Sequence, residues 1–341
     1  MMNARTRRAA WVAMVAAPAL ALTACGGGGE AEGDGGGGGD VELTFATSYN
    51  EDQPQHTCGA TVIKEQIESA DVGISVEIYP SSQLGGDAER IAAVASGDID
   101  MDIQGASALG SVYEPVSVLD AAYAFDDADH LAAFAASDAG QQLFTDFADE
   151  TGVNTLGVWS AGARHFTANK PILAPADLEG QRIRFPGSPQ FLLNAQALGA
   201  SATEVAYEEL YLALQQGTVD GQENPITNIA SQNLQEVQSD ISLTEHQLNT
   251  NLVLIGEIWN EFDADQQQVV TDAVAMAVDE VTACVDEEDA ATIEEWESGD
   301  EWNVHSDVDV DAFREQAVSW FEENLDDEAL SVFESIRAAA S

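Results

Sequence analysis

The chain has 341 residues, a formal net charge of −50 and 45% hydrophobic residues. This length and this hydrophobic content allow two lobes with packed cores and argue against a disordered chain. So negative a chain repels nucleic acid and anionic lipid, which argues against both as binding partners. The charge resembles the acidic, halophilic-type surfaces of proteins from high-salt environments, where dense counterions screen the repulsion.

The N-terminus is typical of a bacterial secretory signal. Three arginines precede an apolar run from Ala9 to Leu22, and small residues follow before Cys25. The end of this pattern resembles a lipobox, so we expect a lipoprotein signal peptide over 1–24 and lipidation of Cys25. An ordinary signal peptide with a chance cysteine is the alternative. The Gly-rich stretch 25–40 favours the anchor, because this composition forms a flexible tether. The sequence thus predicts an extracytoplasmic protein anchored to the cell membrane by lipid.

Strand and helix patterns alternate from residue 41 onward, which predicts α/β layers with mainly parallel sheets. In chain order the predicted elements are a strand Val41–Ala46, a helix Cys58–Ser69, a strand Gly73–Tyr79, a helix Asp87–Ser96, the strands Asn154–Trp159 and Gln181–Phe185, and a helix Tyr207–Gln216.

Two of these helices are followed by similar sequences. Gly97-Asp98-Ile99-Asp100 follows the first, and Gly217-Thr218-Val219-Asp220 follows the second. In both, a glycine ends the helix, and a β-branched residue and an aspartate lead into the next strand. The same unit used twice predicts two similar lobes.

A long acidic helix pattern runs from Asp263 to about Glu297, with apolar residues at helical spacing. A helix of this length could brace two lobes across their back. Two shorter helices broken near 286–289 are the alternative.

Two cysteines remain after the predicted anchor, Cys58 and Cys284. An exported protein lies in an oxidising compartment, so a disulfide between them is one interpretation. Two separate buried thiols are the other, and the sequence does not decide between them. Because neither cysteine lies in a Cys-x-x-Cys spacing, no structural zinc site is expected.

Positive charge is concentrated in one short segment. Of the basic residues that follow the signal, half lie between Arg164 and Arg184. In Gln181-Arg182-Ile183-Arg184-Phe185, strand alternation places Arg182 and Arg184 on one face. A guanidinium binds a carboxylate through two parallel hydrogen bonds, so this cluster predicts an anion site. Pairing of Arg184 with a nearby acidic residue is the alternative.

A second candidate is Asp220-Gly221-Gln222-Glu223-Asn224-Pro225. The Asn224 amide can both donate and accept, which suits a hydroxyl or a carboxylate. A polar turn without a ligand is the alternative. The sequence contains no recognisable nucleophile with its base, phosphate loop, dinucleotide fingerprint or paired-histidine metal motif. Binding is therefore expected rather than catalysis, without a cofactor or metal.

These motifs resemble the solute-binding proteins of tripartite ATP-independent periplasmic (TRAP) transporters, the dicarboxylate-binding-protein-like family. The resemblance covers roughly residue 41 to the C-terminus. Its quoted segments are Tyr79-Pro80-Ser81-Ser82-Gln83-Leu84-Gly85-Gly86, Gly97-Asp98-Ile99-Asp100-Met101, Lys170-Pro171-Ile172, Asp177-Leu178-Glu179-Gly180, Ile183-Arg184, Leu198-Gly199-Ala200, Leu210–Gly217 and Asp220–Pro225.

The resemblance implies an α/β, two-lobed periplasmic-binding-protein (flytrap) fold with a long helix bracing both lobes. Lobe I would comprise 41–161 plus 250–289, and lobe II 162–249 plus 290–341. The protein would not be an enzyme. It would deliver a small carboxylate-bearing solute to the TRAP membrane subunits for secondary, ion-coupled uptake. The binding lipoprotein of an ATP-driven (ABC) importer and an extracytoplasmic enzyme on a similar fold are the alternatives.

For the site, the resemblance implies a salt bridge between Arg184 and a ligand carboxylate, supported by Arg164 and Asn224. Some sugar-acid binders place an acid near Gly105, whereas this chain has uncharged polar residues there. C4-dicarboxylates, sugar acids, 2-oxo acids, aromatic acids and zwitterionic osmolytes all remain possible ligands. The predicted ligand-binding residues are Arg184, Arg164, Asn224, Gln104, Ser107 and Phe185.

Overall fold

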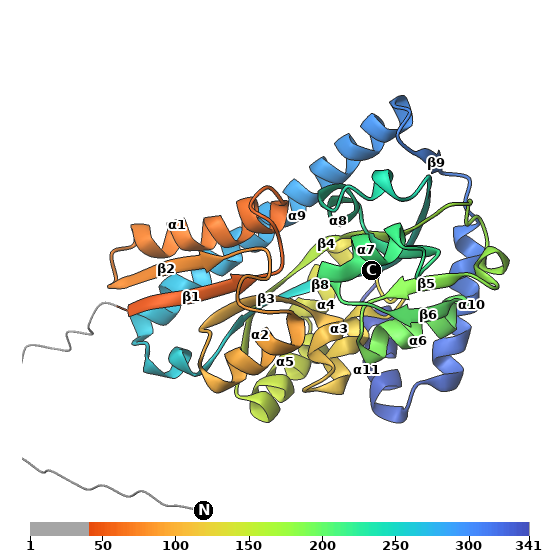
Figure 1. Ribbon diagram of the computed structural model, residues 1–341. Helices are drawn as coiled ribbons and strands as arrows, with labels where there is room; N and C mark the ends of the chain where they lie inside the picture. Colours follow the sequence, from red (N-terminus) through yellow and green to blue (C-terminus); the bar gives the residue numbers. More distant parts are fainter. Residues whose placement is uncertain (1–40, 341) are drawn as a thin grey trace, which may run out of the picture. The chain divides into compact units, whose positions relative to one another are not determined.

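The computed structural model describes residues 41–340, so the predicted signal peptide (1–24), Cys25 and the tether (25–40) lie outside the described residues. The strands form one mixed sheet in the order β2-β1-β3-β8-β4-β7-β5-β6, and β9 pairs with β8 (Figure 1). They are β1 (Val41–Thr47), β2 (Ile74–Tyr79), β3 (Met101–Gly105), β4 (Asn154–Ala168), β5 (Arg182–Phe185), β6 (Ser201–Glu204), β7 (Gly221–Pro225), β8 (Asp240–Ile255) and β9 (Asn303–His305).

Helices connect the strands, and none in the described part of the chain is long and apolar enough to cross a membrane. The α-helices are α1 (Thr61–Ser69), α2 (Asp87–Ser96), α3 (Ala106–Leu109), α4 (Ala128–Ala136), α5 (Asp138–Thr151), α6 (Pro189–Leu198), α7 (Leu210–Gln215), α8 (Ile226–Ser231), α9 (Ala264–Ser298), α10 (Val310–Asn324) and α11 (Asp327–Ala338). Shorter helical turns include η1 (Gln55–Ala60), η2 (Glu114–Asp120) and η4 (Tyr207–Glu209).

The sheet consists of two halves with the same connectivity. In the first half-sheet (β1, β2, β3 and β8), β1 pairs in parallel with β2 and β3, and β3 pairs antiparallel with β8. In the second half-sheet (β4, β5, β6 and β7), β5 pairs in parallel with β6 and β7, and β7 pairs antiparallel with β4. The antiparallel pair β4–β8 joins the halves. The predicted parallel pairing therefore holds within the outer strands of each half-sheet and for β8–β9, whereas the pairs β3–β8, β4–β8 and β4–β7 are antiparallel.

The two similar sequences that end in Asp100 and Asp220 form the same hydrogen bonds with the backbone in the two half-sheets. In the first half-sheet, the Asp100 amide donates to Thr44 O over 3.2 Å, and Asp100 Oδ2 accepts from the Thr44 amide over 2.7 Å. In the second, the Asp220 amide donates to Arg182 O over 2.8 Å, and Asp220 Oδ2 accepts from the Arg182 amide over 3.0 Å. The glycine three residues before each aspartate is left-handed, with φ of +77° and +65°. Each aspartate therefore fixes the start of the strand that leads to the cavity described below.

Two long strands depart from the prediction. The strand expected over 154–159 continues to Ala168, and β8 was not predicted at all. β4 shifts register against β8 between Ser160 and Ala163, where Gly162 is left-handed with φ of +91°. A side chain at Gly162 would collide with Asp289 of α9, because a Cβ there would lie 2.6 Å from Asp289 Oδ2. The irregular backbone therefore admits α9 close to the centre of the sheet.

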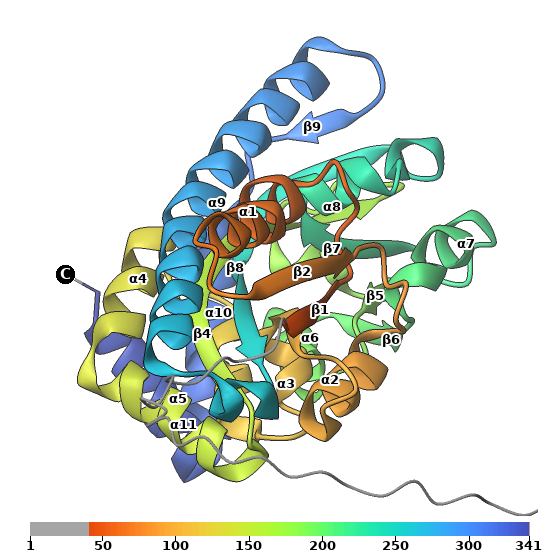
Figure 2. The same ribbon diagram turned by 90° about the vertical axis from the view of Figure 1, so that its left-hand side faces the viewer.

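Helix α9 is unbroken, which excludes the alternative of two shorter helices. It runs from beside α1 past β4 to α8 and β9 (Figures 1 and 2). Its inward stripe is buried at Val270, Val274, Ala277, Val281 and Val285. The predicted brace along both half-sheets is therefore present.

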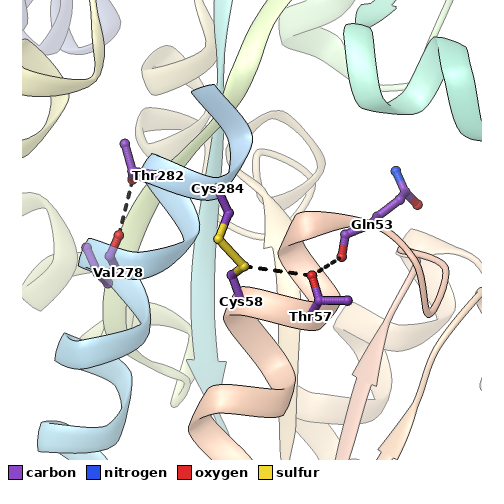
Figure 3. The surroundings of a disulfide bond; sticks show 6 residues. All are labelled: Gln53, Thr57, Cys58, Val278, Thr282 and Cys284. Carbon is purple, nitrogen blue, oxygen red and sulfur yellow. Dashed lines mark hydrogen bonds between the residues drawn. A yellow bond between two sulfur atoms is a disulfide. The ribbon is translucent and has the colours of Figure 1, made fainter. Parts of the chain in front are cut away.

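Cys58 of η1 and Cys284 of α9 form a disulfide, with Cα atoms 6.6 Å apart (Figure 3). The predicted helix over 58–69 accordingly begins earlier, as the π-helical turn η1, and continues as α1. The bond ties the first half-sheet's helices to the brace. The predicted lobe boundaries (41–161 plus 250–289, and 162–249 plus 290–341) stay a prediction.

Candidate functional site

A cavity of about 170 Å³ lies between the two half-sheets, where β1, β3, β5 and β7 end. Tyr49 follows β1 and Gln104 lies near the end of β3, whereas Arg184 and Asn224 lie near the ends of β5 and β7. In open α/β sheets, ligands bind outside the carboxyl ends of the strands. This cavity is therefore the candidate site.

Arg184 contributes a buried positive charge to the cavity. The residue is 1% exposed, and its Nε donates to Val205 O over 2.8 Å. Its Nη1 is buried without a hydrogen-bond partner, and no carboxylate of residues 41–340 forms an ion pair with it. Burial lowers the pKa of Arg184 to about 10, so the guanidinium stays charged at neutral pH. The alternative of a pairing with a nearby acidic residue is therefore not realised.

Arg164, unlike Arg184, forms an ion pair within the protein. Its Nε and Nη2 donate to the two carboxylate oxygens of Glu223, and both side chains are buried. Burial alone would raise the pKa of Glu223, but the charge and hydrogen bonds of Arg164 lower it below its ordinary value. The carboxylate is therefore ionised and neutralises Arg164 inside the protein.

Amide side chains hold the remaining Arg164 donors. Nη1 donates to Asn249 Oδ1 over 2.8 Å, and Nη2 donates to Asn224 Oδ1 over 3.0 Å. The guanidinium also lies over the Phe191 ring, 4.8 Å from its centroid. The structure thus brings Asn224 and Arg164 together in one network, in which Nε, Nη1 and Nη2 of Arg164 each have at least one partner.

The first half-sheet supplies the opposite wall of the cavity. Gln104 and Ser107, two of the predicted ligand-binding residues, both line it. Ser107 donates through its amide and its hydroxyl to Asp120 Oδ2, over 2.7 and 2.8 Å. Asp120 Oδ1 accepts from the Thr250 amide over 2.8 Å, and burial raises the pKa of Asp120. This wall therefore contains a buried carboxylate that hydrogen bonds hold, without an ion pair to an arginine or lysine of the described part of the chain.

An ion-pair network forms part of this wall and extends behind it. Arg90 is fully buried and donates to Asp102 and to Asp87, each over 3.1 Å. Burial raises the pKa of Asp102 to about 7, against the opposing effect of Arg90. Because Arg90 has two acidic partners, it supplies no free charge to the cavity.

Two residues of β5 have other roles. Phe185 is fully buried in the hydrophobic core and does not line the cavity, so the structure does not bring this predicted ligand contact to the site. Its neighbour Arg184 lies on the other face of the strand because successive residues of a strand alternate. Arg182 shares the Arg184 face but lies farther from the strand end, where it is exposed and pairs with Asp220.

Several residues of the cavity wall were not predicted from the sequence. Tyr49 donates to Asn251 Oδ1 over 2.8 Å, and both line the cavity. Ser188, at the N-terminus of α6, and Asn228 of α8 also line it. Within residues 41–340, no group of three or more His, Cys, Asp or Glu side chains is placed to hold a metal ion.

The chain is similar to one family of known proteins over most of its length. The family model of the bacterial extracellular solute-binding proteins, family 7, matches residues 45–325. A TRAP periplasmic solute-binding protein from Roseobacter denitrificans, solved with bound L-galactonate, superposes with a TM-score of 0.81 at 30% identity. The match covers 88% of this chain and 99% of that one.

Two further relatives differ in what their names say they bind. The sialic acid-binding periplasmic protein of Vibrio cholerae is 30% identical over 69% of this chain and 74% of its own length. The C4-dicarboxylate-binding periplasmic protein of Rhodobacter capsulatus is also 30% identical, over 69% and 72%. Because the two identities are equal, overall similarity does not distinguish these ligand classes.

Proposed function

This chain belongs to the bacterial extracellular solute-binding proteins of family 7, the binding proteins of TRAP transporters, and we propose that it captures a small carboxylate-bearing solute through Arg184. The family comprises transport proteins rather than enzymes, and its members are periplasmic. This assignment, rather than the binding lipoprotein of an ABC importer, accounts for the similarity along the chain.

One observation supports the carboxylate most directly: Arg184 is buried with no acidic partner among the described residues, and its Nη1 has no hydrogen-bond partner. A buried charge without a partner is costly, and an incoming carboxylate restores both the charge balance and the missing hydrogen bond. Each charge-assisted hydrogen bond contributes about 1.5–3 kcal/mol. Arg164 and Asn224 support the site indirectly, because their network fixes the wall beside Arg184.

Binding is coupled to closure in this proposal. Arg184 and Asn224 belong to the second half-sheet, and Gln104 and Ser107 to the first half-sheet and its following helix. A carboxylate held first by Arg184 brings the opposite wall within hydrogen-bond reach. The closed, loaded protein then delivers the solute to the TRAP membrane subunits, which take it up by secondary, ion-coupled transport.

We also propose that lipidation of Cys25 anchors the protein on the outer side of the cell membrane, with residues 25–40 as the tether. Replacement of Cys25 by serine should abolish the incorporation of radiolabelled palmitate and release the protein into the soluble fraction. Unchanged fractionation of this variant would refute the anchor without affecting the proposed binding function.

The binding function is tested by thermal shift in high salt with a panel of carboxylates and, for each, the corresponding alcohol or amide. A ligand at 100 times its dissociation constant stabilises the protein by about 2.7 kcal/mol. At least one carboxylate should raise the melting temperature while its uncharged counterpart should not. If uncharged compounds stabilise the protein as well as carboxylates do, the proposal is wrong.

A further inference from the structure

Within residues 41–340, the cavity offers one free positive charge to a ligand. Two arginines line it, but Glu223 neutralises Arg164, and the Nε and both Nη atoms of Arg164 have partners within the protein. Among the described residues, Arg184 is the cavity arginine left with an unpartnered nitrogen. One free guanidinium binds one carboxylate, and a second carboxylate would have no cation of its own.

The opposite wall is negative. Asp87 and Asp120 line the cavity from α2 and η2. Asp120 accepts three hydrogen bonds and forms no ion pair with a described residue, and Asp87 shares Arg90 with Asp102. A ligand whose first carboxylate pairs with Arg184 therefore presents its far end to a wall with more acidic than basic charge. Like charges repel, and no free cation of the described residues offsets this repulsion at the far end, which disfavours a second carboxylate.

Besides Arg184 Nη1, two further buried polar atoms of the described residues at the cavity are unpartnered. Ser188 Oγ lies at the start of α6 and could accept or donate a hydrogen bond, and Asn228 Oδ1 can only accept one. Asn228 Nδ2 is already engaged with Tyr207 Oη, over 3.1 Å. A ligand hydroxyl can donate to Asn228 and pair with Ser188, whereas an apolar or carboxylate group cannot satisfy Asn228.

The cavity volume sets the size of the ligand. About 170 Å³ accommodates on the order of ten water-sized groups. That is about the size of a six-carbon sugar acid.

From these four observations we propose that the solute is a polyhydroxy monocarboxylate of the six-carbon aldonate class, and that the site discriminates against dicarboxylates. This inference rests on the proposed function, because it assumes that Arg184 binds a carboxylate. Two features would select a monocarboxylate over a dicarboxylate. Glu223 neutralises the charge of Arg164, and Asp87 and Asp120 repel a second carboxylate.

The test uses matched probes that differ only at their ends. In the gluco, manno and galacto series, the aldonate has one terminal carboxylate, the aldarate has two and the alditol has none. Calorimetry in high salt should give at least one aldonate that binds at least tenfold more tightly than its aldarate, with no binding of its alditol. Succinate should bind more weakly than that aldonate.

The outcomes separate this inference from the proposed function. If an aldarate or succinate binds as tightly as the best aldonate, or if no aldonate binds while another carboxylate does, the inference is wrong and the carboxylate function stands. If an alditol binds as tightly as its aldonate, or if no carboxylate binds, both are wrong.

A charge variant provides a second readout. Asp87→Asn removes one negative charge from the wall and frees Arg90 of one partner, so it should narrow the aldonate-to-aldarate affinity ratio by several-fold. Asp279→Asn is the matched control, because it removes the same charge from the exposed face of α9. An unchanged ratio in Asp87→Asn, with both variants folded by circular dichroism, would contradict repulsion by this wall.

Discussion

Ser82 and Glu208 meet from opposite half-sheets: the serine hydroxyl donates to Glu208 Oε1 over 2.7 Å, although 126 residues separate them in the chain. Ser82 lies in the loop between β2 and α2, and Glu208 follows the cavity residue Tyr207. The Ser82 backbone is left-handed, and its amide donates to Thr47 O over 3.1 Å. The hydroxyl thus bridges the two half-sheets, and we propose that it acts as a latch that opens when they separate.

The first prediction concerns this latch. Ser82→Ala removes the hydrogen bond to a charged acceptor. Because the contact is exposed, its loss should destabilise the closed, ligand-bound form by about 0.5–1.5 kcal/mol. Ligand should therefore dissociate about two- to tenfold faster. Ser81→Ala is the matched control, since the Ser81 hydroxyl bonds to Asn50 within the same half-sheet's loops. Stopped-flow dissociation measures both, and equal rates for Ser82→Ala and the parent would exclude a latch.

The second prediction concerns Arg184. Lysine keeps the charge but loses the planar fork, so Arg184→Lys should lose at least one charge-assisted hydrogen bond. That corresponds to about 1.5–3 kcal/mol, or roughly 10- to 150-fold in affinity. Arg182→Lys on the same strand should bind normally, because Arg182 pairs with Asp220 in solvent. Calorimetry in high salt decides, and retained affinity in Arg184→Lys would remove this residue from the site.

The third prediction concerns the disulfide. In a Cys25→Ser background, the oxidised protein should show no free thiol in denaturant before reduction, and two thereafter. The bond spans 226 residues, for which the chain-entropy model gives an upper figure of about 5 kcal/mol. Reduction should therefore lower the denaturation midpoint. Two titratable thiols in the unreduced protein would show that Cys58 and Cys284 are not joined in solution.

The fold was predictable where the sequence has regular periodicity. The helix over 87–96 and the brace over 263–297 matched closely, because their apolar residues recur at helical spacing. β8 was not predicted, because it carries polar residues such as His246, Gln247 and Asn249 along a strand that is nevertheless buried. These side chains have partners on other elements, and no local pattern reveals such partners.

The site was predictable in part for the same reason. The concentration of arginines in a very acidic chain singled out Arg184. The ion pair of Arg164 with Glu223 could not be predicted, since Glu223 lies 59 residues further along the chain. Phe185 shows a different limit: strand alternation places it opposite Arg184, but aromatic character alone suggested a ligand contact.

The fourth prediction concerns Asp289, which lies against Gly162 where β4 is irregular. Burial, reinforced by Asp286 and Glu288, raises the pKa of Asp289 to about 8 from 3.8. Between these values the folded protein holds a proton that the unfolded chain releases. This group therefore makes the free energy of unfolding fall as pH rises through this window, by at most about 1.4 kcal/mol per pH unit.

The side chain introduced in Asp289→Asn cannot titrate. The free energy of unfolding of this variant, relative to that of the parent, should therefore increase from pH 5 to pH 8 and stay constant above pH 8. Asp279→Asn, on the exposed face of the same helix, should show no such trend. Urea denaturation at several pH values in high salt measures the difference. A constant difference between Asp289→Asn and the parent would mean that Asp289 is ionised throughout.

The last prediction concerns closure. Arg184 and Asn224 lie on the second half-sheet, whereas Gln104 and Ser107 lie across the cavity. Ligand can shift an open–closed equilibrium only by its differential affinity for the two states, and here only the closed state offers both walls. The carboxylate with the largest thermal shift should therefore reduce the radius of gyration in small-angle scattering. Arg184→Ala should show no reduction at the same ligand concentration, since the first contact is lost. If the parent binds this carboxylate tightly with an unchanged scattering profile, the flytrap mechanism is wrong for this protein, even where the ligand class is right.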